Sequence, residues 1–429
     1  MVDNAASWKN FIEYAKLTDI GLRRSNNQDS FAVVLAGDEQ EFYRRGHLFL
    51  VADGMGAHAA GELASKLSAT GIPHTYHKLI DRPPPEALQQ AFVEANANIH
   101  GRGQANAEFQ GMGTTTCVLA LLPEGAVVAH VGDSRVYRLR EHRLEQLTFD
   151  HSLVWEMMAA GQMPKGEVPA FVPKNIITRS LGPHPDVQVD LEGPFELQVG
   201  DIFLMCSDGL SGQVRDDEIC LILSALSPEE AVRVLVDLAN LRGGPDNITV
   251  IVIRVVGALA PPTSRAENNS YPATNHERSR STNPAPWIVG VVCLLAAAIL
   301  GLSGNVWPAI GVGAGASLML AALAVWRFSS SGPAPRPAMP GGPLGRGPHT
   351  SLECIPGHES VAGFAQVAGK LREAAIDEQW QVDWNRFNAY QERAQQASLK
   401  SNWMQAVREY ALAISFMMDE IRHKTVKRS

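Results

Sequence analysis

The sequence has few cysteines and none of the spacings that bind zinc. Five cysteines occur in 429 residues, an odd number, widely separated and without a CxxC pair. This distribution argues against a disulfide framework and against a zinc site. Three of the five lie inside apolar runs, where we interpret them as small core residues. The cysteines are Cys117, Cys206, Cys220, Cys293 and Cys354.

The sequence also lacks a basic segment and an apolar leader. Its formal net charge is −8 and its pI is about 5.9. No basic stretch is available to neutralise phosphates, which argues against nucleic acid as a partner. Residues 1–16 contain no long apolar core, so we expect no signal peptide. A chain of 429 residues is long enough for two or more domains.

What the sequence does contain is a repeated pairing of an apolar run with an aspartate. LFLVA precedes Asp53 and Gly54, IFLMCS precedes Asp208, and Asp246 lies just before ITVIVIRVV. Such runs predict short buried strands that end in turn residues. A carboxylate at the end of a buried strand is partly desolvated, and Mg²⁺ or Mn²⁺ stabilises it through oxygen ligation. We therefore predict a binuclear metal site, although any single Asp-Gly pair is typical of an ordinary turn.

Other polar residues lie at similar positions. Asp133 joins two segments of alternating hydrophobicity, so it lies at a predicted hairpin tip, where an aspartate is by default a turn residue. Arg24, Asn27 and Asp29 come just before a further apolar stretch, residues 31–35.

The order of these motifs resembles that of the metal-dependent Ser/Thr protein phosphatases of type 2C, in particular their bacterial members. The resemblance covers residues 15–256 and rests on eight ordered motifs, a set far more specific than one motif. They are GLRRSNNQDS, VADGMGAHAAGE, GMGTTT, GDSRVYRL, LTFDHS, ITRSLG, CSDGL and GGPDNITV.

The resemblance assigns five residues to metals. Asp53 matches the carboxylate that bridges two cations, and Gly54 matches the glycine whose backbone carbonyl completes one coordination sphere. Asp208 and Asp246 match the remaining direct ligands, and Asp133 matches the ligand of a third, weaker metal. The implied cofactors are two Mn²⁺ or Mg²⁺ ions, which hold a bridging hydroxide that attacks the phosphoryl group in line without a phosphoenzyme.

The resemblance assigns two further residues to the substrate side of the site. Arg24 matches a phosphate clamp, which suits the planar fork of a guanidinium, and Asp29 matches an acid that orients metal-bound water. Met55 stands where animal members have a histidine proposed to protonate the leaving group, so the general acid stays unassigned. A water on the third metal and His58 are the two candidates. Ala57 replaces a second glycine of the motif.

The expected fold is α+β, with two antiparallel β-sheets packed as a sandwich and flanked by helices. Grouped strands with separate helices predict this architecture.

Residues 152–180 lie where the family carries its flap. Strands are expected near residues 31–35, 48–52, 115–122, 127–131, 135–139, 202–206 and 248–256, and helices near 58–80, 86–100 and 228–240.

Beyond the phosphatase domain, residues 1–256, the composition changes. Residues 257–286 predict a flexible linker, and 287–328 predict a transmembrane helical hairpin with its turn at 303–305. The flanks carry arginines and the turn carries no cation, so both flanks are expected in the cytoplasm, at the inner (cytoplasmic) membrane. A buried helical pair and a re-entrant or interfacial hairpin are the alternatives. The expected interfacial tryptophans are Trp287, Trp307 and Trp326.

A second Pro/Gly-rich linker, residues 329–358, leads to a predicted helical hairpin tail, residues 359–429. The tail loosely resembles one tetratricopeptide unit. One such unit cannot bury its apolar face. Packing of the two helices on each other or on a second chain is the alternative to peptide binding. The tail's partner is unknown. Its two apolar stripes are Trp380, Trp384, Phe387, Gln391 and Ala394, and Trp403, Val407, Tyr410, Ile414, Met417 and Ile421.

These features predict a membrane-anchored hydrolase of phosphoserine and phosphothreonine in proteins, reversing Ser/Thr kinase signalling. The expected partners are phosphorylated proteins, including a Ser/Thr protein kinase, and membrane lipid around the hairpin. Three alternatives are a catalytically silent phosphoprotein receptor, a phosphatase dedicated to an anti-sigma-factor antagonist, and a transporter-like or structural membrane protein.

Overall fold

The computed structural model describes residues 8–56, 59–163, 172–173, 176–259 and 343–428. The chain divides into two compact units. The first joins Met1–Ala266 with Pro343–Ser429, and the second is Glu267–Gly342. The second unit, which includes the predicted membrane hairpin at 287–328, lies outside the described residues.

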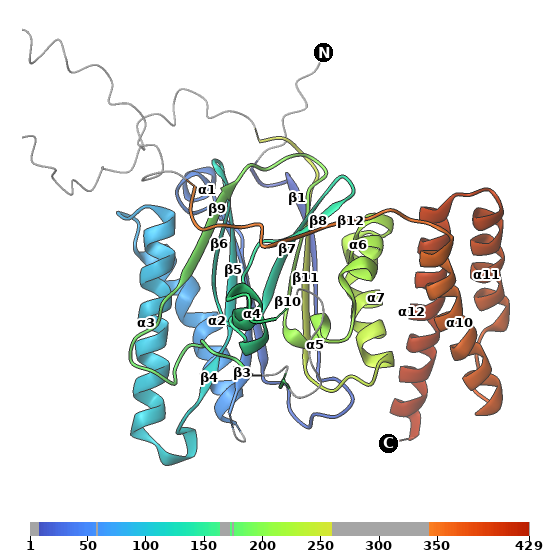
Figure 1. Cartoon of the computed structure of the whole chain (residues 1–429), viewed down its shortest axis with the longest axis horizontal. Coiled ribbons are helices and arrows are strands. Elements are labelled where there is room, and N and C mark those ends of the chain that lie inside the picture. Colours follow the sequence, from blue (N-terminus) through green and yellow to red (C-terminus); the bar gives the residue numbers. More distant parts are fainter. Residues whose placement is uncertain (1–7, 57–58, 164–171, 174–175, 260–342, 429) are drawn as a thin grey trace, which may run out of the picture. The chain divides into compact units, whose positions relative to one another are not determined.

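The first unit is built on two antiparallel sheets that pack face to face (Figure 1). Each sheet has six strands. The two packed antiparallel sheets confirm the predicted α+β sandwich. One sheet has the order β1 (Ile12–Asp19), β11 (Ile248–Val255), β10 (Ile202–Cys206), β7 (Arg135–Arg140), β8 (Arg143–Gln146) and β12 (Thr350–Glu353). The other has the order β2 (Asp29–Val34), β3 (His47–Met55), β5 (Thr116–Leu122), β6 (Gly125–Val131) and β9 (Asp190–Phe195), with β4 (Gly113–Thr114) paired to β3.

The central strands are buried on both faces, which explains their continuous apolar runs. In β10, Phe203 and Met205 enter the core between the two sheets. Ile202, Leu204 and Cys206 enter a second core on the other face of the same sheet. Because successive side chains of a strand point to opposite faces, one strand serves both cores.

Helices cover the outer face of each sheet. α2 (Ala60–Lys78) and α3 (Pro84–Ala105) lie over the sheet of β2 and β3, and α6 (Asp216–Ala225) and α7 (Pro228–Leu241) lie over the other. α7 begins as predicted, with proline in the first turn and a capping box between Ser227 and Glu230. Shorter elements are α1 (Glu39–Arg45), the 3₁₀ turn Ala107–Phe109, α4 (Leu153–Ala159) and α5 (Asp208–Ser211).

The cysteines differ from expectation in one respect. Cys220 of α6 and Cys354, just after β12, form a disulfide with a Cα–Cα distance of 6.0 Å. Cys117 and Cys206 are free and buried, which confirms their prediction as core residues. An odd number of widely spaced cysteines did not indicate the pair, because the fold brings together two residues 134 positions apart.

The predicted linker at 329–358 is partly structured. Residues 350–353 form β12, which pairs with β8 and extends the first sheet at its edge. Leu344 also pairs with Gly193 through backbone hydrogen bonds. All four residues of β12 are exposed, so burial does not drive this strand and its pattern carries no apolar signal.

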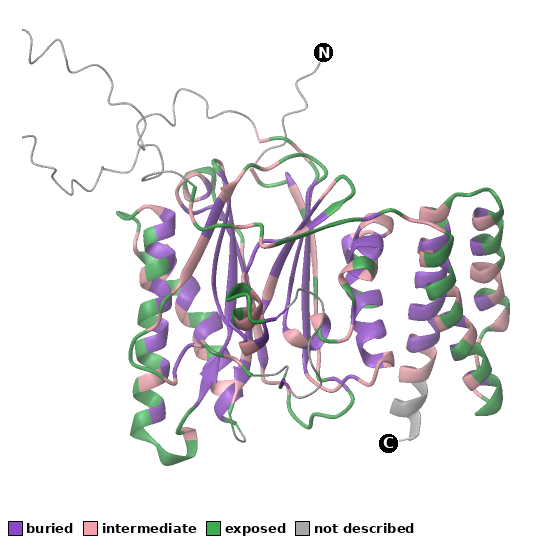
Figure 2. Cartoon of the chain, in the orientation of Figure 1, coloured by how far each residue is buried: buried purple, intermediate pink, exposed green. Residues whose placement is uncertain are grey.

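The tail has three helices, and the predicted hairpin is therefore incomplete. α11 (Trp384–Leu399) and α12 (Trp403–Arg428) match the two predicted stripes, and α10 (His358–Asp377) precedes them. α12 packs against α10 and α11 on one side and against α6 and α7 of the phosphatase domain on the other. Figure 2 shows buried residues along the facing sides of α7 and α12. The tail therefore shares a core with the phosphatase domain.

Hydrogen bonds and ion pairs join α12 to α7. Ser415 donates a hydrogen bond of 2.6 Å to Asp237, which is fully buried, and Arg422 pairs with the same carboxylate. Burial raises the pKa of Asp237 to about 6, against the opposing effects of Arg422 and Ser415. Arg408 binds both oxygens of Glu230. A buried carboxylate that depends on partners from another segment fixes the register of the two helices.

The Ser415→Ala variant tests this docking. It leaves one oxygen of a buried carboxylate without its donor, which is expected to destabilise the chain by about 1–3 kcal/mol. Because the contact joins the tail to the phosphatase domain, urea should abolish activity at a lower concentration. The matched control is Ser398→Ala, since the Ser398 hydroxyl donates to the Ala394 carbonyl of its own helix. Equal midpoints for Ser415→Ala and wild type would show that the tail does not support the phosphatase domain.

Among the described residues, none of the helices combines the length and the hydrophobicity needed to cross a bilayer.

Candidate metal centre

Two carboxylates meet across the β2–β3 pair. Asp29 opens β2 and is paired in register with Asp53 near the end of β3. Gly54 follows Asp53, and a Cβ there would lie 2.1 Å from the backbone oxygen of Gly61 in α2. Only glycine permits α2 to approach the strand so closely at the position next to Asp53.

The other sheet supplies two more acids. Asp208 is the first residue of α5, separated by one residue from the end of β10, and Asp246 lies just before β11. The Asn247 side chain links the turn that carries Asp246 to the N-terminal segment, residues 20–28. Its side-chain oxygen accepts from the Gln28 amide at 2.8 Å, and its side-chain nitrogen donates to the carbonyls of Ile20 and Asn26.

Asp133 completes the group at the tip between β6 and β7, as predicted. It is flanked by Gly132 and by Ser134, whose hydroxyl lies 2.7 Å from that of Thr115. The Thr115 amide in turn donates to the Asp53 carbonyl at 2.9 Å. The structure therefore brings all five predicted acidic residues to one end of the sandwich.

The five carboxylates interact strongly. Burial raises the pKa of Asp53 well above its ordinary value, and the charges of Asp29, Asp208, Asp133 and Asp246 raise it further. Burial, helped by neighbouring acids, raises the pKa of Asp29 to about 7 and that of Asp133 to about 8. Clustered acids of this kind cost free energy unless cations neutralise them.

The unsatisfied oxygens of this cluster fit divalent cations. One buried carboxylate oxygen on each of Asp29, Asp133 and Asp208 has no hydrogen-bond partner. Natural proteins seldom leave such atoms unpaired, and Mg²⁺ or Mn²⁺ binds to carboxylate and backbone oxygens. The donor set of acids with the Gly54 carbonyl therefore fits these metals, and it contains neither the thiolates nor the imidazoles that zinc prefers.

Arg24 lies at the mouth of the same site. Its guanidinium pairs with Asp246 at 2.6 Å, and its side chain is about half exposed. It is therefore a cation that is open to solvent and in contact with one of the acids. An exposed guanidinium beside a metal cluster can bind phosphate oxygens in a bidentate way.

Among the described residues, we identify no general acid beyond the two candidates of the sequence prediction. Met55 ends β3 and carries no dissociable proton. Ala57 and His58, the alternative candidate, lie outside the described residues. Asn27 accepts from the Asp29 amide and donates to Thr18, so it shapes the loop.

Two supporting residues were missed from sequence. The Ser207 hydroxyl donates to Asp29 at 2.7 Å and accepts from the Thr249 amide. Asn247 was quoted in a motif but given no role. Each is next to a predicted metal ligand, and that position in the sequence is the feature from which its supporting role could have been predicted.

A family model for protein phosphatase 2C matches residues 23–238, about half of the chain. The chain belongs to the protein phosphatase 2C family. Protein phosphatase PhpP of Streptococcus pneumoniae is 39% identical over 250 residues, covering 56% of this chain and 97% of PhpP. Serine/threonine protein phosphatase PstP of Mycobacterium tuberculosis is 36% identical over 248 residues, covering 57% of this chain and 45% of PstP.

Solved structures agree. The M. tuberculosis phosphatase PstP/Ppp is 35% identical, with a TM-score of 0.50 over 57% of this chain and 99% of that one. The S. agalactiae serine/threonine phosphatase is also 35% identical, with a TM-score of 0.51 over 57% of this chain and 100% of that one. The activity of this protein phosphatase 2C is therefore metal-dependent dephosphorylation of serine and threonine in proteins, with two Mn²⁺ or Mg²⁺ ions as cofactors.

Proposed function

We propose that this phosphatase acts on phosphoproteins at the cytoplasmic membrane, reversing the action of a Ser/Thr protein kinase. The observation that carries the catalytic part is the group of five carboxylates with an exposed arginine at its mouth. The membrane part rests on the apolar segments within residues 287–328 and on their flanking arginines.

We assign the residues as follows. Asp53, the Gly54 carbonyl, Asp208 and Asp246 would hold two divalent cations, and Asp133 would hold a third, weaker one. When bound, the two cations supply a water of lowered pKa and neutralise charge on the phosphoryl group.

The protein's own groups position the reaction. Arg24 binds two phosphoryl oxygens from the solvent side, which holds the phosphorus facing the acids. Asp29, fixed by the Ser207 hydroxyl, accepts a hydrogen bond from the attacking water and aligns it. Met55 cannot donate the proton that the leaving serine or threonine oxygen needs, so a water on the Asp133 side and His58 are the two candidate donors.

Among the alternatives, the silent receptor is disfavoured because every predicted acid and Arg24 are present in one site. A phosphatase dedicated to an anti-sigma-factor antagonist shares all of this chemistry and differs only in substrate. Phosphoproteome change on deletion of the gene separates the two: one altered protein indicates the dedicated enzyme, and many indicate the broader one.

Metal removal tests the function directly. Chelation of the purified chain should abolish hydrolysis of a phosphothreonine peptide, and Mn²⁺ should restore it. Mn²⁺ should also stabilise the folded chain, by about 2.7 kcal/mol at a concentration 100 times its dissociation constant. Ca²⁺ at equal ionic strength is the control for screening. Full hydrolysis after chelation would refute the metal mechanism.

Reporter fusions test the membrane arrangement. A reporter before residue 1 and another after residue 429 should both report cytoplasm, because a hairpin returns the chain to the side it left. The docking of α12 on α7 supports placing both ends on one side of the membrane, since the tail and the phosphatase domain share one core. A periplasmic signal from the C-terminal reporter would contradict the hairpin, and full recovery in the soluble fraction would contradict the anchor.

A further inference from the structure

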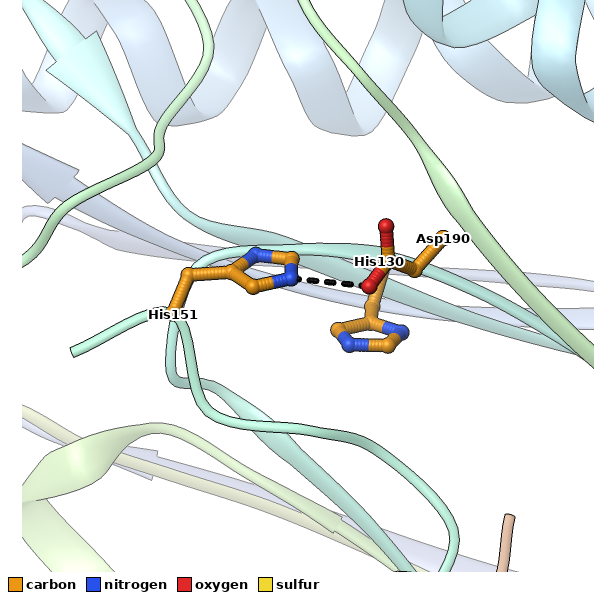
Figure 3. Close-up of side chains that lie close together, drawn as sticks. All are labelled: His130, His151 and Asp190. Carbon is orange, nitrogen blue, oxygen red and sulfur yellow. Dashed lines mark hydrogen bonds and ion pairs between the residues drawn. The ribbon is translucent and has the colours of Figure 1, made fainter. Parts of the chain in front are cut away.

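A buried hydrogen-bonded chain joins Asp190 to the turn that carries Asp133. His151, fully buried, lies 3.0 Å from an Asp190 oxygen through Nε2 (Figure 3). Its Nδ1 accepts from the Gly132 amide at 2.9 Å. Because an Nδ1 that accepts a hydrogen bond carries no proton, the ring proton is on Nε2 and is donated to Asp190.

Asp190 is suited to hold this tautomer. Burial acts to raise its pKa, but the hydrogen bond from His151 and the charge of Arg179 bring the pKa below its ordinary value. Arg179 donates to the other Asp190 oxygen at 2.6 Å. Asp190 therefore stays ionised and keeps His151 fixed in orientation.

His151 holds Gly132 by backbone as well as by side chain. Its own amide donates to the Gly132 carbonyl at 3.0 Å, so the peptide groups on both sides of Gly132 are fixed. Gly132 has φ +109, and a Cβ there would lie 2.4 Å from the Cβ of Thr115. Thr115 contacts the other side of the turn through Ser134. The Asp133 turn is thus held between His151 and Thr115.

The same three side chains could be taken for a metal site. One ligand atom from each of His130, His151 and Asp190 lies within 4.8 Å of the others. Both nitrogens of His151 and both oxygens of Asp190, however, already have partners. His130 stacks on His151 at 5.0 Å, and burial lowers its pKa to about 3, so it is neutral. Hydrogen bonding accounts for His151 and Asp190 without a cation, whereas the buried His130 Nδ1 has no hydrogen-bond partner among the described residues.

We propose that His151, oriented by Asp190, is a positioning residue that fixes the Gly132 amide and thereby aims the Asp133 carboxylate at its cation. This inference rests on the third-metal role proposed above for Asp133. His151 touches neither substrate nor metal and acts only through the turn.

Calorimetric Mn²⁺ titration of the full chain tests the proposal. The weak site is defined as the one lost in Asp133→Ala. His151→Ala should weaken that site at least about 10-fold, because one turn bond is worth about 1.4 kcal/mol. The two tighter sites should change less than about twofold. His151→Asn should restore the weak site, because its side-chain oxygen can take the place of Nδ1.

His130→Ala is the matched control. It removes the other imidazole of the stacked pair. His130 hydrogen-bonds to the Phe149 backbone and not to Gly132. Equal losses of Mn²⁺ affinity at the weak site in His130→Ala and His151→Ala would show that the effect comes from packing of the stacked rings. That result would overturn the proposal. Zn²⁺ binding to wild type that both variants abolish would overturn it in favour of a metal site.

Two further measurements keep the outcomes distinct. ¹⁵N spectra of wild type should show the His151 proton on Nε2, and a proton on Nδ1 would overturn the proposal without any variant. If His151→Ala does not fold, Asp190→Asn takes its place, with an expected loss of about threefold at the weak site. If wild type has no site that depends on Asp133, the proposed third-metal role fails. If it has one and His151→Ala leaves it intact, only the positioning role fails.

Discussion

The Asp53→Asn variant is expected to lose hydrolysis by about 10³-fold or more, at least about 4 kcal/mol of transition-state stabilisation. The charges of the other four acids each raise the pKa of Asp53. An amide keeps the shape of the side chain but removes the charge that two cations share. Steady-state hydrolysis of a phosphothreonine peptide across a range of Mn²⁺ concentrations measures the loss.

Folding separates this chemical effect from damage to the structure. Burial and neighbouring acids raise the pKa of Asp53, so in the absence of metal its charge destabilises the fold. Metal-free Asp53→Asn should therefore unfold at the same temperature as wild type or higher, and Mn²⁺ should stabilise it less. Asp81→Asn, at an exposed carboxylate, is the control. Normal turnover of Asp53→Asn with saturating Mn²⁺ would remove Asp53 from the centre.

The central strands could be predicted from sequence because they are buried on both faces. β5 and β6 are buried at every residue, so their apolar runs are continuous. β1 was missed because its residues are all half-buried or exposed and include Glu13 and Lys16. β12 was missed because its residues are all exposed. A strand at a sheet edge is held by backbone hydrogen bonds, which leave little trace in residue type.

The metal ligands could be predicted, but the residues that support them could not. Asp53, Asp208 and Asp246 follow or precede apolar runs, and that position is visible in the sequence. Ser207 reaches Asp29 across 178 positions, and Asn247 reaches Gln28 across 219. Serine and asparagine beside turns are common, so only the fold distinguishes these contacts from ordinary turn chemistry.

The tail shows a different limit. The stripe on α12 was predicted, and its burial is confirmed, but the surface that covers it was not specified. α10 escaped notice because two of its five buried positions are alanines, which weaken an apolar stripe. In the phosphatase domain, α12 packs on α6 and α7 of the same chain, and nothing in an amphipathic pattern distinguishes an internal partner from a second chain.

The Arg24→Ala variant is expected to reduce kcat/KM by about 30- to 1000-fold, about 2–4 kcal/mol, the cost of losing one preorganised charged donor. Arg24 is exposed on the solvent side of the acids and reaches Asp246 at 2.6 Å. A phosphoryl group that enters the site competes with Asp246 for this guanidinium. Arg24→Lys should recover only part of the loss, because an ammonium cannot bind two phosphate oxygens as a planar fork does.

Calorimetry distinguishes a phosphate clamp from a structural cation. Arg24 pairs with Asp246, a proposed metal ligand, so its removal frees that carboxylate. Mn²⁺ should therefore bind Arg24→Ala as tightly as wild type or slightly more tightly, while the substrate is turned over poorly. Arg23→Ala is the matched control, since Arg23 is the adjacent exposed arginine and makes no ion pair among the described residues. Weaker Mn²⁺ binding in Arg24→Ala would mean that this guanidinium shapes the metal site and does not bind substrate.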